Sequence, residues 1–400
     1  MIIVKRFAIP PSSELIRLAE CSCLLYNKCN YIIRNQFFRN REGGDRFPLP
    51  HIGELWNQVS REDFCINLHN TKTAKQTIRR CINDWSNYFK ACKAFQRSPE
   101  SFVRKPKPPG YKSRRSQVTY YTETLKAKAL REGVIEPTNG CFRVHAGLSK
   151  ILQVTVTPKK FGFVVDVQYD DGNEPEKNKG DGFAFIDLGV NNLAAITSDK
   201  FDPILVNGRI VKSINRNYNK HMCKRTLQKR YWRLENYFHN ASKRIVELCY
   251  QNNVSTVVIG KNDGWKQGKR MGKKSRQNFR SIPFTTLIQK ITYKARQKGM
   301  SVIFTEESYT SKASFKDRES MSPEGEHKGN RVKRGLFRNN DGSLINADVN
   351  GSLNIGRKVI GNAIYDGRFD MSLAARPERW NPLNPARPRV SVRVPILQSE

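Results

Sequence analysis

The sequence predicts a multidomain α/β protein, and three observations support this. A chain of 400 residues is longer than one ordinary hydrophobic core requires, so two or three domains are expected. Apolar residues recur with a helical period in the first part of the chain and with a period of two between residues 117 and 169. From residue 183 onward, strand-like and helix-like segments alternate, which is typical of a sheet covered by helices.

The N-terminal part combines helices with a small antiparallel sheet. An opening strand, residues 1–10, precedes a helical lobe over residues 11–116, whose second long helix begins near Thr71. Alternating runs over residues 117–172 predict an antiparallel sheet or barrel. We expect the opening strand to complete that sheet, which makes the helical lobe an insertion. A charged linker, residues 173–182, leads to the next domain.

The C-terminal part, residues 183–360, contains three consecutive strands followed by alternating helices and strands. The strands are FAFIDLGV, NLAAITS, PILVNG, STVVIG and MSVIFTEE, and helices are expected over about 212–251, 283–298 and 346–359. This is the element order of an RNase H-like mixed sheet, although other α/β folds share it. Residues 361–400 are rich in proline and arginine and predict an irregular basic tail.

The charge of the chain predicts a polyanionic partner. Lys and Arg number 71 against 36 Asp and Glu, which gives a formal net charge of +35. Such an excess destabilises a compact chain unless a polyanion neutralises it, and solubility requires far less charge. We therefore expect nucleic acid to bind, although solvated loops are the alternative for the same residues. The candidate contacts are basic side chains and one interleaved aromatic: Arg104, Lys105, Lys107, Lys112, Arg114, Arg115, Trp265, Lys266, Lys269, Arg270, Lys273, Lys274, Arg276 and Lys312.

No membrane segment or structural metal site is expected from the composition. The chain contains no run of about eighteen apolar residues, and its N-terminus lacks a signal-peptide core. We expect a cytoplasmic protein associated with the prokaryotic nucleoid, without a membrane partner. The nine cysteines lack zinc-ligand spacing and are expected to be reduced thiols.

Three carboxylates are candidates for a catalytic site. Asp187 ends the first apolar strand of the C-terminal part, and Asp348 lies in the first turn of its last helix. The strand STVVIG ends at Gly260 without an acid, whereas the following strand ends in Glu306 and Glu307. A parallel neighbour is displaced by about 4.8 Å, which a glutamate side chain can span, and alternation sends only one of the two glutamates to the site face. Taken singly, these acids are also explained as a turn former, a helix-dipole partner and a solvated pair.

Several segments together resemble a known family of nucleases. They are IDLGVNNLAAITS, VVIGKNDGWKQ, NFRSIPFTTLIQKITYKARQKG, TEESYTSKASF and NADVNGSLNI, in this order, with KPKPPGYK upstream. In these segments the chain resembles TnpB, the transposon-encoded RNA-guided DNA endonucleases that are ancestors of the type V CRISPR effectors. The resemblance implies a wedge-type antiparallel β-barrel (1–10 and 117–172) with an inserted helical recognition lobe, followed by an RNase H-like RuvC nuclease domain (183–360) with a basic loop over 261–282.

Two features depart from the family pattern. Gly260 stands where the second acid is usual, and some relatives carry a relocated glutamate that matches Glu307 here, with Glu306 as second choice and Asp263 as third. The zinc-ribbon region, residues 308–345, has no cysteine, so we regard it as degenerate and expect no zinc.

The resemblance implies an enzyme, a metal-dependent RNA-guided DNA endonuclease. Its partners would be a guide RNA and target double-stranded DNA, and its cofactor two Mg²⁺ ions, with Mn²⁺ as a substitute. Asp187 would bridge both ions, and Glu307 and Asp348 would each complete one coordination sphere. Because of Gly260, a nuclease-inactive RNA-guided repressor stays open as an alternative, as does a type V CRISPR effector of the same fold. A transposase of this fold would usually carry a glutamate on the last helix, which here offers Asp348.

Overall fold

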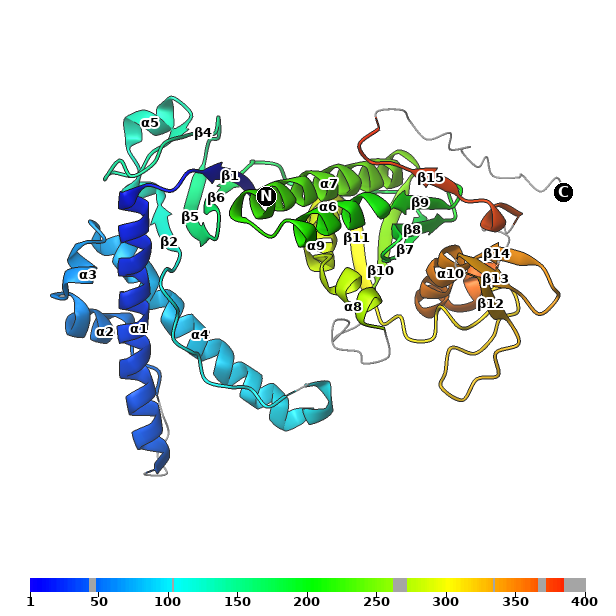
Figure 1. Cartoon of the computed structure of the whole chain (residues 1–400), viewed down its shortest axis with the longest axis horizontal. Coiled ribbons are helices and arrows are strands. Elements are labelled where there is room, and N and C mark those ends of the chain that lie inside the picture. Colours follow the sequence, from blue (N-terminus) through cyan, green and yellow to red (C-terminus); the bar gives the residue numbers. More distant parts are fainter. Residues whose placement is uncertain (43–47, 103, 262–271, 334, 366–371, 385–400) are drawn as a thin grey trace. The chain divides into compact units, whose positions relative to one another are not determined.

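The computed structural model describes residues 1–42, 48–102, 104–261, 272–333, 335–365 and 372–384. The chain divides into two compact units, Met1–Asn173 and Glu174–Glu400. Their elements are labelled in Figure 1. No helix within the described residues is both long and apolar enough to cross a bilayer.

The first unit is built on a four-stranded antiparallel sheet. The sheet order is β1 (Ile2–Ile9), β6 (Gly162–Asp170), β5 (Ile151–Lys159) and β2 (Val118–Tyr121). β1 pairs with β6 along its whole length, from Ile2↔Asp170 to Ile9↔Phe163. Between β1 and β2 the chain forms the helices α1 (Ser13–Glu42), α2 (Ile52–Val59), α3 (Asp63–Ile66) and α4 (Thr71–Arg97). A small excursion after β2 contains α5 (Ala127–Arg131), β3 (Val134–Ile135) and β4 (Val144–His145).

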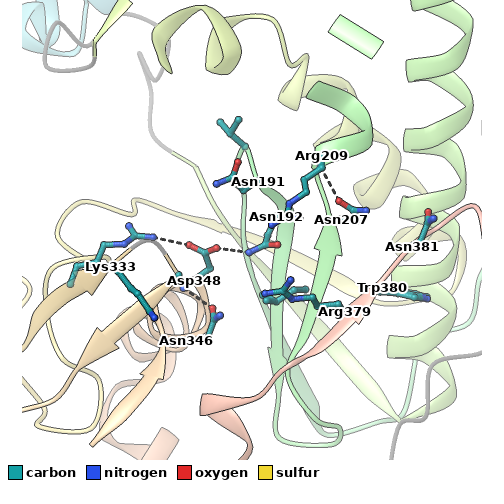
Figure 2. Close-up of a pocket in the computed structure, with 15 residues that line it drawn as sticks. Asn191, Asn192, Asn207, Arg209, Lys333, Asn346, Asp348, Arg379, Trp380 and Asn381 are labelled. Atoms are coloured by element: carbon teal, nitrogen blue, oxygen red, sulfur yellow. Dashed lines mark hydrogen bonds and ion pairs between the residues drawn. The ribbon is translucent and has the colours of Figure 1, made fainter. Parts of the chain in front are cut away.

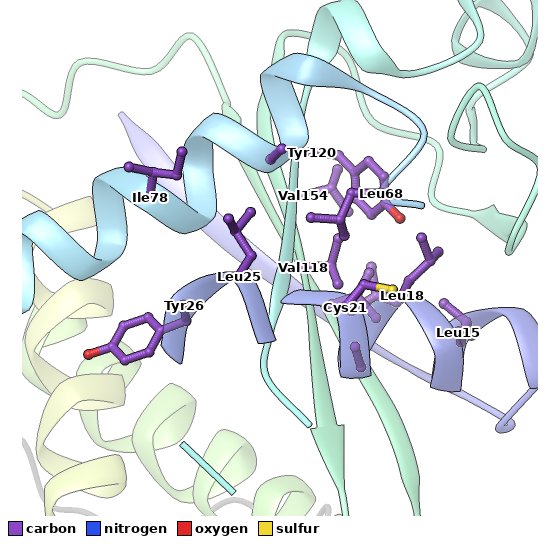
Figure 3. Packing of buried hydrophobic residues seen from close by; sticks show 14 of the residues in the cluster. Leu15, Leu18, Cys21, Leu25, Tyr26, Leu68, Ile78, Val118, Tyr120 and Val154 are labelled. Carbon is purple, nitrogen blue, oxygen red and sulfur yellow. The ribbon is translucent and has the colours of Figure 1, made fainter. Parts of the chain in front are cut away.

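The alternating pattern left a sheet or a barrel open, and in the described residues the strands form an open sheet rather than the wedge-type β-barrel that the resemblance implies. β1 and β2 are the two edges of an open sheet, because four strands are too few to close around a filled interior. Helices cover the apolar face instead. Leu18 and Leu25 of α1 and Ile78 of α4 share one core with Val118 and Val154 of the sheet, as Figure 3 shows. A single core therefore joins the helical segment to the sheet.

The second unit contains a six-stranded mixed sheet. Its order is β11 (Ser301–Thr305), β10 (Val254–Gly260), β7 (Gly182–Asp187), β8 (Asn192–Ser198), β9 (Ile204–Asn207) and β15 (Glu378–Trp380). β7, β8 and β9 follow one another as an antiparallel meander, whereas β10 and β11 run parallel to β7. The three consecutive strands and the two later ones thus form the mixed sheet that their order along the chain predicts.

The side chains of successive residues in these strands point to opposite faces of the sheet. On one face, Ile186, Ile196 and Ile259 pack against α7 (Lys224–Gln251) and α9 (Phe284–Gln297). On the other, Phe185 and Val258 pack against α10 (Ala347–Ile360). Because side chains alternate along a strand, Asp187 lies on the same face as Phe185, which is the face that α10 covers.

Two predicted elements differ from the observed ones. The helix predicted over 212–251 is interrupted, so that α6 (Arg209–Lys220) precedes α7. The break occurs because Cys223 takes an extended conformation and caps α7, its backbone N–H donating to the Thr226 hydroxyl. The tail predicted to be irregular contributes β15, which pairs in parallel with β9. Residues 385–400 of that tail lie outside the described residues.

Candidate active site

Helix α10 lies close to the sheet because the residues that face the strands are small. The Ser352 hydroxyl donates to the Phe185 carbonyl oxygen at 2.8 Å. A Cβ atom added to Gly356 would lie 2.5 Å from the Phe185 ring. At the start of the helix, the Asn346 side chain accepts hydrogen bonds from the backbone N–H groups of Asp348 and Val349. These contacts fix the first turn of α10, which carries Asp348, against the sheet.

Asp187 and Asp348 lie near one another at the end of β7. A Cβ atom on Gly351, one turn after Asp348, would lie 2.8 Å from Asp187 Oδ2, so the Asp187 carboxylate rests on the helix surface. Burial, and then the nearby Asp348 carboxylate, raise the pKa of Asp187 to about 7. Two carboxylates that repel each other in this way favour a cation between them.

The Asp348 carboxylate has two further partners, Asn192 and Arg331. Asn192 Nδ2 donates to Oδ2 at 2.6 Å, as Figure 2 shows. Arg331 Nη2 lies 3.3 Å from Oδ1. Neither residue was predicted from the sequence. Asn192 had a weak signal, since it directly follows the loop after Asp187. No feature of the sequence distinguishes Arg331 from the many other Lys and Arg residues.

Glu307 occupies the space above Gly260. β11 pairs in parallel with β10, with Gly260 opposite Thr305, so Glu307 follows two residues beyond that level. A Cβ atom on Gly260 would lie 2.8 Å from Glu307 Oε2 and 2.5 Å from Cδ1 of Ile355, on α10. The Glu307 carboxylate therefore fills the volume that a side chain at position 260 would take. It lies on the face of the sheet that also carries Asp187.

Glu306 is directed elsewhere. Its Oε2 lies 3.0 Å from Lys358 Nζ, and its Oε1 accepts a hydrogen bond from the Ser308 backbone N–H at 2.9 Å. The side chain is 58% exposed. The third candidate for the second acid, Asp263, lies outside the described residues.

The three acids lie on one face of the sheet but do not form one tight cluster. Within the described part of the chain, no three His, Cys, Asp or Glu side chains approach closely enough to hold a metal ion. Glu307 lies beside Ile355, about two helical turns of α10 beyond Asp348. The donors are nonetheless all carboxylate oxygens, which suit Mg²⁺ or Mn²⁺. The mutual repulsion of Asp187 and Asp348 also fits a cation site.

The segment between Glu307 and α10 is held together by a network of hydrogen bonds. Its antiparallel strands are β12 (Asn330–Lys333), β13 (Leu336–Arg338) and β14 (Leu344–Asn346). The Glu319 carboxylate accepts from the backbone N–H groups of Ser314 at 2.7 Å, Lys328 at 2.7 Å and Gly329 at 2.8 Å. Asn350 of α10 bonds to Phe315 and Ala313 in the same segment. This network holds the chain immediately before Arg331.

The predicted nucleic-acid contacts of the first unit share one extended segment. Arg34 Nη1, on α1, donates to the Pro109 carbonyl oxygen at 2.8 Å and fastens this segment to the helix. Lys112 and Arg115 pair with the acidic residues Asp84 and Glu20. The remaining predicted residues are exposed and make no ion pair with any described acid: Arg104, Lys105, Lys107 and Arg114.

The predicted contacts of the second unit are described only in part. Lys312 is exposed, and its Nζ lies 5.4 Å from the centroid of the Tyr309 ring. Arg276 is half-buried on α8 (Lys273–Arg280). The side chains of Lys273 and Lys274 lie outside the described part of the chain, as do the whole residues Trp265, Lys266, Lys269 and Arg270.

Part of the chain matches a known family model, and most of it is similar to a curated protein. Residues 284–355, from α9 to α10, match the family model described as Cas12f1-like, TNB domain. A curated relative, TnpB-like protein ORF457 of Acidianus two-tailed virus, is 23% identical over 433 aligned positions that cover 92% of this chain and 88% of the relative.

Two solved structures are also similar over most of the chain. One, a Cas12f1–sgRNA–target DNA complex, is 13% identical with a TM-score of 0.45, over 86% of this chain and 82% of that chain. The other, a CRISPR–Cas12f ternary complex, is 12% identical with a TM-score of 0.34, over 86% and 81%. Residues 284–355 are thus similar to a Cas12f1-like TNB domain, and most of the chain is similar to a TnpB-like protein.

Proposed function

We propose that this protein is an RNA-guided DNA endonuclease of the RuvC type, which uses Asp187, Glu307 and Asp348 as its metal-binding acids. The relationship to TnpB and Cas12f proteins indicates an RNA-guided nuclease family. The observation that carries the proposal is the position of Glu307 Oε2 over Gly260, on the face that carries Asp187. The sheet supports it too, since an antiparallel meander extended by two parallel strands is the arrangement of RNase H-like nucleases.

The chemistry assigned to the site is hydrolysis of a DNA phosphodiester. Bound Mg²⁺ or Mn²⁺ would supply charge stabilisation at the phosphate and an activated water. Asp187, Asp348 and Glu307 would hold the ions. Asn192 fixes the orientation of the Asp348 carboxylate through its 2.6 Å hydrogen bond. Arg331, beside Asp348, would place a guanidinium against a phosphate oxygen, where a planar fork of donors binds well.

Sequence recognition is assigned to a guide RNA. The net charge of +35 suits binding to RNA and DNA backbones, and such contacts are independent of sequence. The exposed basic segment that contains Arg104, Lys105 and Lys107 is one such surface. Pairing between the guide and a target strand would then provide the specificity, with the protein reading a short flanking duplex.

A nuclease-inactive, RNA-guided repressor is the second candidate, because Gly260 lacks the usual acid. A protein without a metal site would not require a carboxylate at the position of the missing acid. The observed approach of Glu307 Oε2 to the Gly260 position therefore favours the nuclease.

The test is cleavage by the protein purified together with RNA expressed from its own locus. Plasmids would carry a guide-matched or a scrambled target beside a randomised flanking sequence, in buffer with Mg²⁺. We expect cutting of the matched plasmids alone, and loss of cutting with retained target binding in Asp187→Ala. Binding of the matched target by the wild type without any cutting would establish the repressor instead.

A further inference from the structure

We propose that β15, together with the start of α6 and with β12, forms a phosphate-binding subsite for a single DNA strand beside the candidate active site. This inference rests on the proposed function and adds to it, because it assigns a second phosphate position of the substrate to residues outside the candidate acids. Neither the sequence patterns nor the family resemblance pointed to these residues.

The subsite is a cavity of about 850 Å³ that borders Asp348. Its walls come from the loop after β7, the ends of β9 and α6, and from β12, the α10 cap and β15. Figure 2 shows Arg379 and Trp380 of β15 across the cavity from Lys333, with Asp348 between them and Lys333. The volume accommodates a few nucleotides of one strand and is far too small for a duplex.

The cavity carries an excess of positive charge that the protein itself does not neutralise. Four basic side chains line it, namely Arg209, Arg331, Lys333 and Arg379, against a single acid, Asp348. Arg331 already pairs with Asp348. The other three make no ion pair with an acid among the residues that the structure describes. These basic side chains come from three different elements and line one cavity. This arrangement is better explained by binding of a polyanion than by ordinary solvent-exposed charges.

The register of the sheet sets the distance between this subsite and the candidate active site. Asp187 lies opposite Ala195, Ala195 opposite Leu205, and Leu205 beside Arg379. These four residues form one row across four strands and share one face, which is the face of α10. Three strand spacings separate Asp187 from Arg379, about 14 Å along the sheet. Arg379 is therefore too far away to bind the phosphate at Asp187, and would hold another phosphate of the same strand.

The strand that carries Arg379 is firmly anchored. Trp380 is buried, and the Arg244 guanidinium of α7 lies 4.6 Å from the centroid of its ring. Arg244 Nη1 also donates to the carbonyl oxygens of Asn381 at 3.0 Å and Asn384 at 2.5 Å. Arg379 is thus presented from a fixed backbone, so little conformational freedom is lost when it binds a phosphate.

The subsite is tested by binding rather than cleavage. Full-length, RNA-loaded Asp187→Ala protein would be titrated with a fluorescent oligo-dT strand at several salt concentrations, with and without Arg209→Gln and Arg379→Gln. Each phosphate contact contributes about 0.7 to the slope of log K against log salt for a single strand. We expect the double substitution to lower the slope by about 1.4 and to weaken binding at least tenfold at low salt. Arg296→Gln, on α9 across the sheet, is the matched control and should change neither quantity.

Three outcomes distinguish a single-strand phosphate subsite from a loosened strand or a duplex-binding surface. Arg379→Lys should keep the salt slope, and a slope as low as that of Arg379→Gln would mean that the substitution merely releases β15. An equal fall in slope for an unrelated duplex would overturn the single-strand assignment. An unchanged slope in the double variant would overturn the subsite itself. None of these results depends on cleavage, so a wild type that fails to cut would contradict only the proposed nuclease function.

Discussion

Gly260 and Glu307 are interdependent, since one leaves the space that the other fills. The side chain at the usual acid position would meet Ile355 Cδ1 at 2.5 Å and Glu307 Oε2 at 2.8 Å. A carboxylate can therefore reach this place either from β10 or from the end of β11, but not from both. The absence of a side chain at Gly260 is therefore what allows Glu307 to place its carboxylate there.

Gly260→Ala is expected to displace Glu307 and to overpack the contact with α10. Overpacking of this kind typically costs about 1–3 kcal/mol, so the free energy of unfolding should fall by that amount and cleavage at least tenfold. Urea denaturation and plasmid cleavage would measure the two effects. Gly110→Ala is the matched control, because a Cβ atom there meets no atom within 4 Å. Wild-type activity in Gly260→Ala would contradict the tight fit described for Glu307.

A buried lysine on the far face of the sheet gives a pH prediction. Burial, and then the neighbouring Lys290 and Lys243, lower the pKa of Lys294 to about 7, while its ammonium donates to Ser242 at 2.8 Å. The unfolded chain then binds more protons than the folded one between about pH 7 and 10.5, so stability should rise with pH in that window.

The Lys294 contribution is isolated by comparing variants. Between pH 7 and pH 9 the wild type should gain on the order of 2 kcal/mol more in unfolding free energy than Lys294→Met does. Urea denaturation of both proteins at both pH values gives the change in unfolding free energy of each, and the two changes are then compared. An equal pH dependence in the two proteins would show that Lys294 keeps an ordinary pKa.

At the scale of residues, the positions of the candidate acids at strand and helix ends could be predicted from the sequence, but the residues that contact them could not. Asp187, Asp348 and the two glutamates stand at strand and helix ends, which local patterns predict. Arg331 lies beside Asp348, and Arg379 lines the neighbouring cavity, only because segments distant in the sequence fold back toward α10. Their residue type is common in this chain, so no local pattern distinguishes them.

The segment between β11 and α10 depends on one buried carboxylate. The Glu319 side chain is only 7% exposed and joins the backbone at Ser314 to that at Lys328 and Gly329. Hydrogen bonds to a charged acceptor are among the stronger ones, at about 1.5–3 kcal/mol each. A carboxylate is therefore able to hold together loops that a structural metal would otherwise organise.

Glu319→Ala should destabilise the second unit by about 2–3 kcal/mol, because three backbone N–H groups, two of them partly buried, lose their charged acceptor. Thermal unfolding would measure the loss, with Glu324→Ala as the control for an exposed glutamate in the same segment. A zinc chelator should leave the midpoint of the wild type unchanged. A fall of the midpoint on chelation, restored by added zinc, would contradict a metal-free segment.

Elements with strong periodicity were predictable, and those defined by long-range pairing were not. The strands of the mixed sheet and the helices α1, α4, α9 and α10 follow from apolar spacing and capping residues. β15 is three residues long and exists because β9 offers an open edge and α7 a site for Trp380. The break between α6 and α7 is caused by the extended conformation of Cys223. It could not be predicted because the apolar residues on both sides follow a helical pattern.

On the scale of the whole molecule, the net charge of +35 demands a counter-charge. Protein purified from cells that express its own locus should carry RNA, and the affinity for that RNA should fall steeply with salt because bound counterions are released. Absorbance ratios, sequencing of the bound RNA and filter binding between about 50 and 200 mM salt would test this. Nucleic-acid-free protein would contradict it.

The most direct test of the proposed nuclease site compares two adjacent glutamates in the guided cleavage assay. Glu307→Gln keeps the shape of the side chain but removes the charge that a metal site requires, so cleavage of a matched plasmid with Mg²⁺ should disappear. RNA binding and target binding should stay at wild-type levels. Glu306→Gln should cut nearly as well as the wild type, because Glu306 pairs with Lys358 away from Gly260. Full cutting by Glu307→Gln, or its loss in Glu306→Gln alone, would contradict the assignment of Glu307 as the relocated acid.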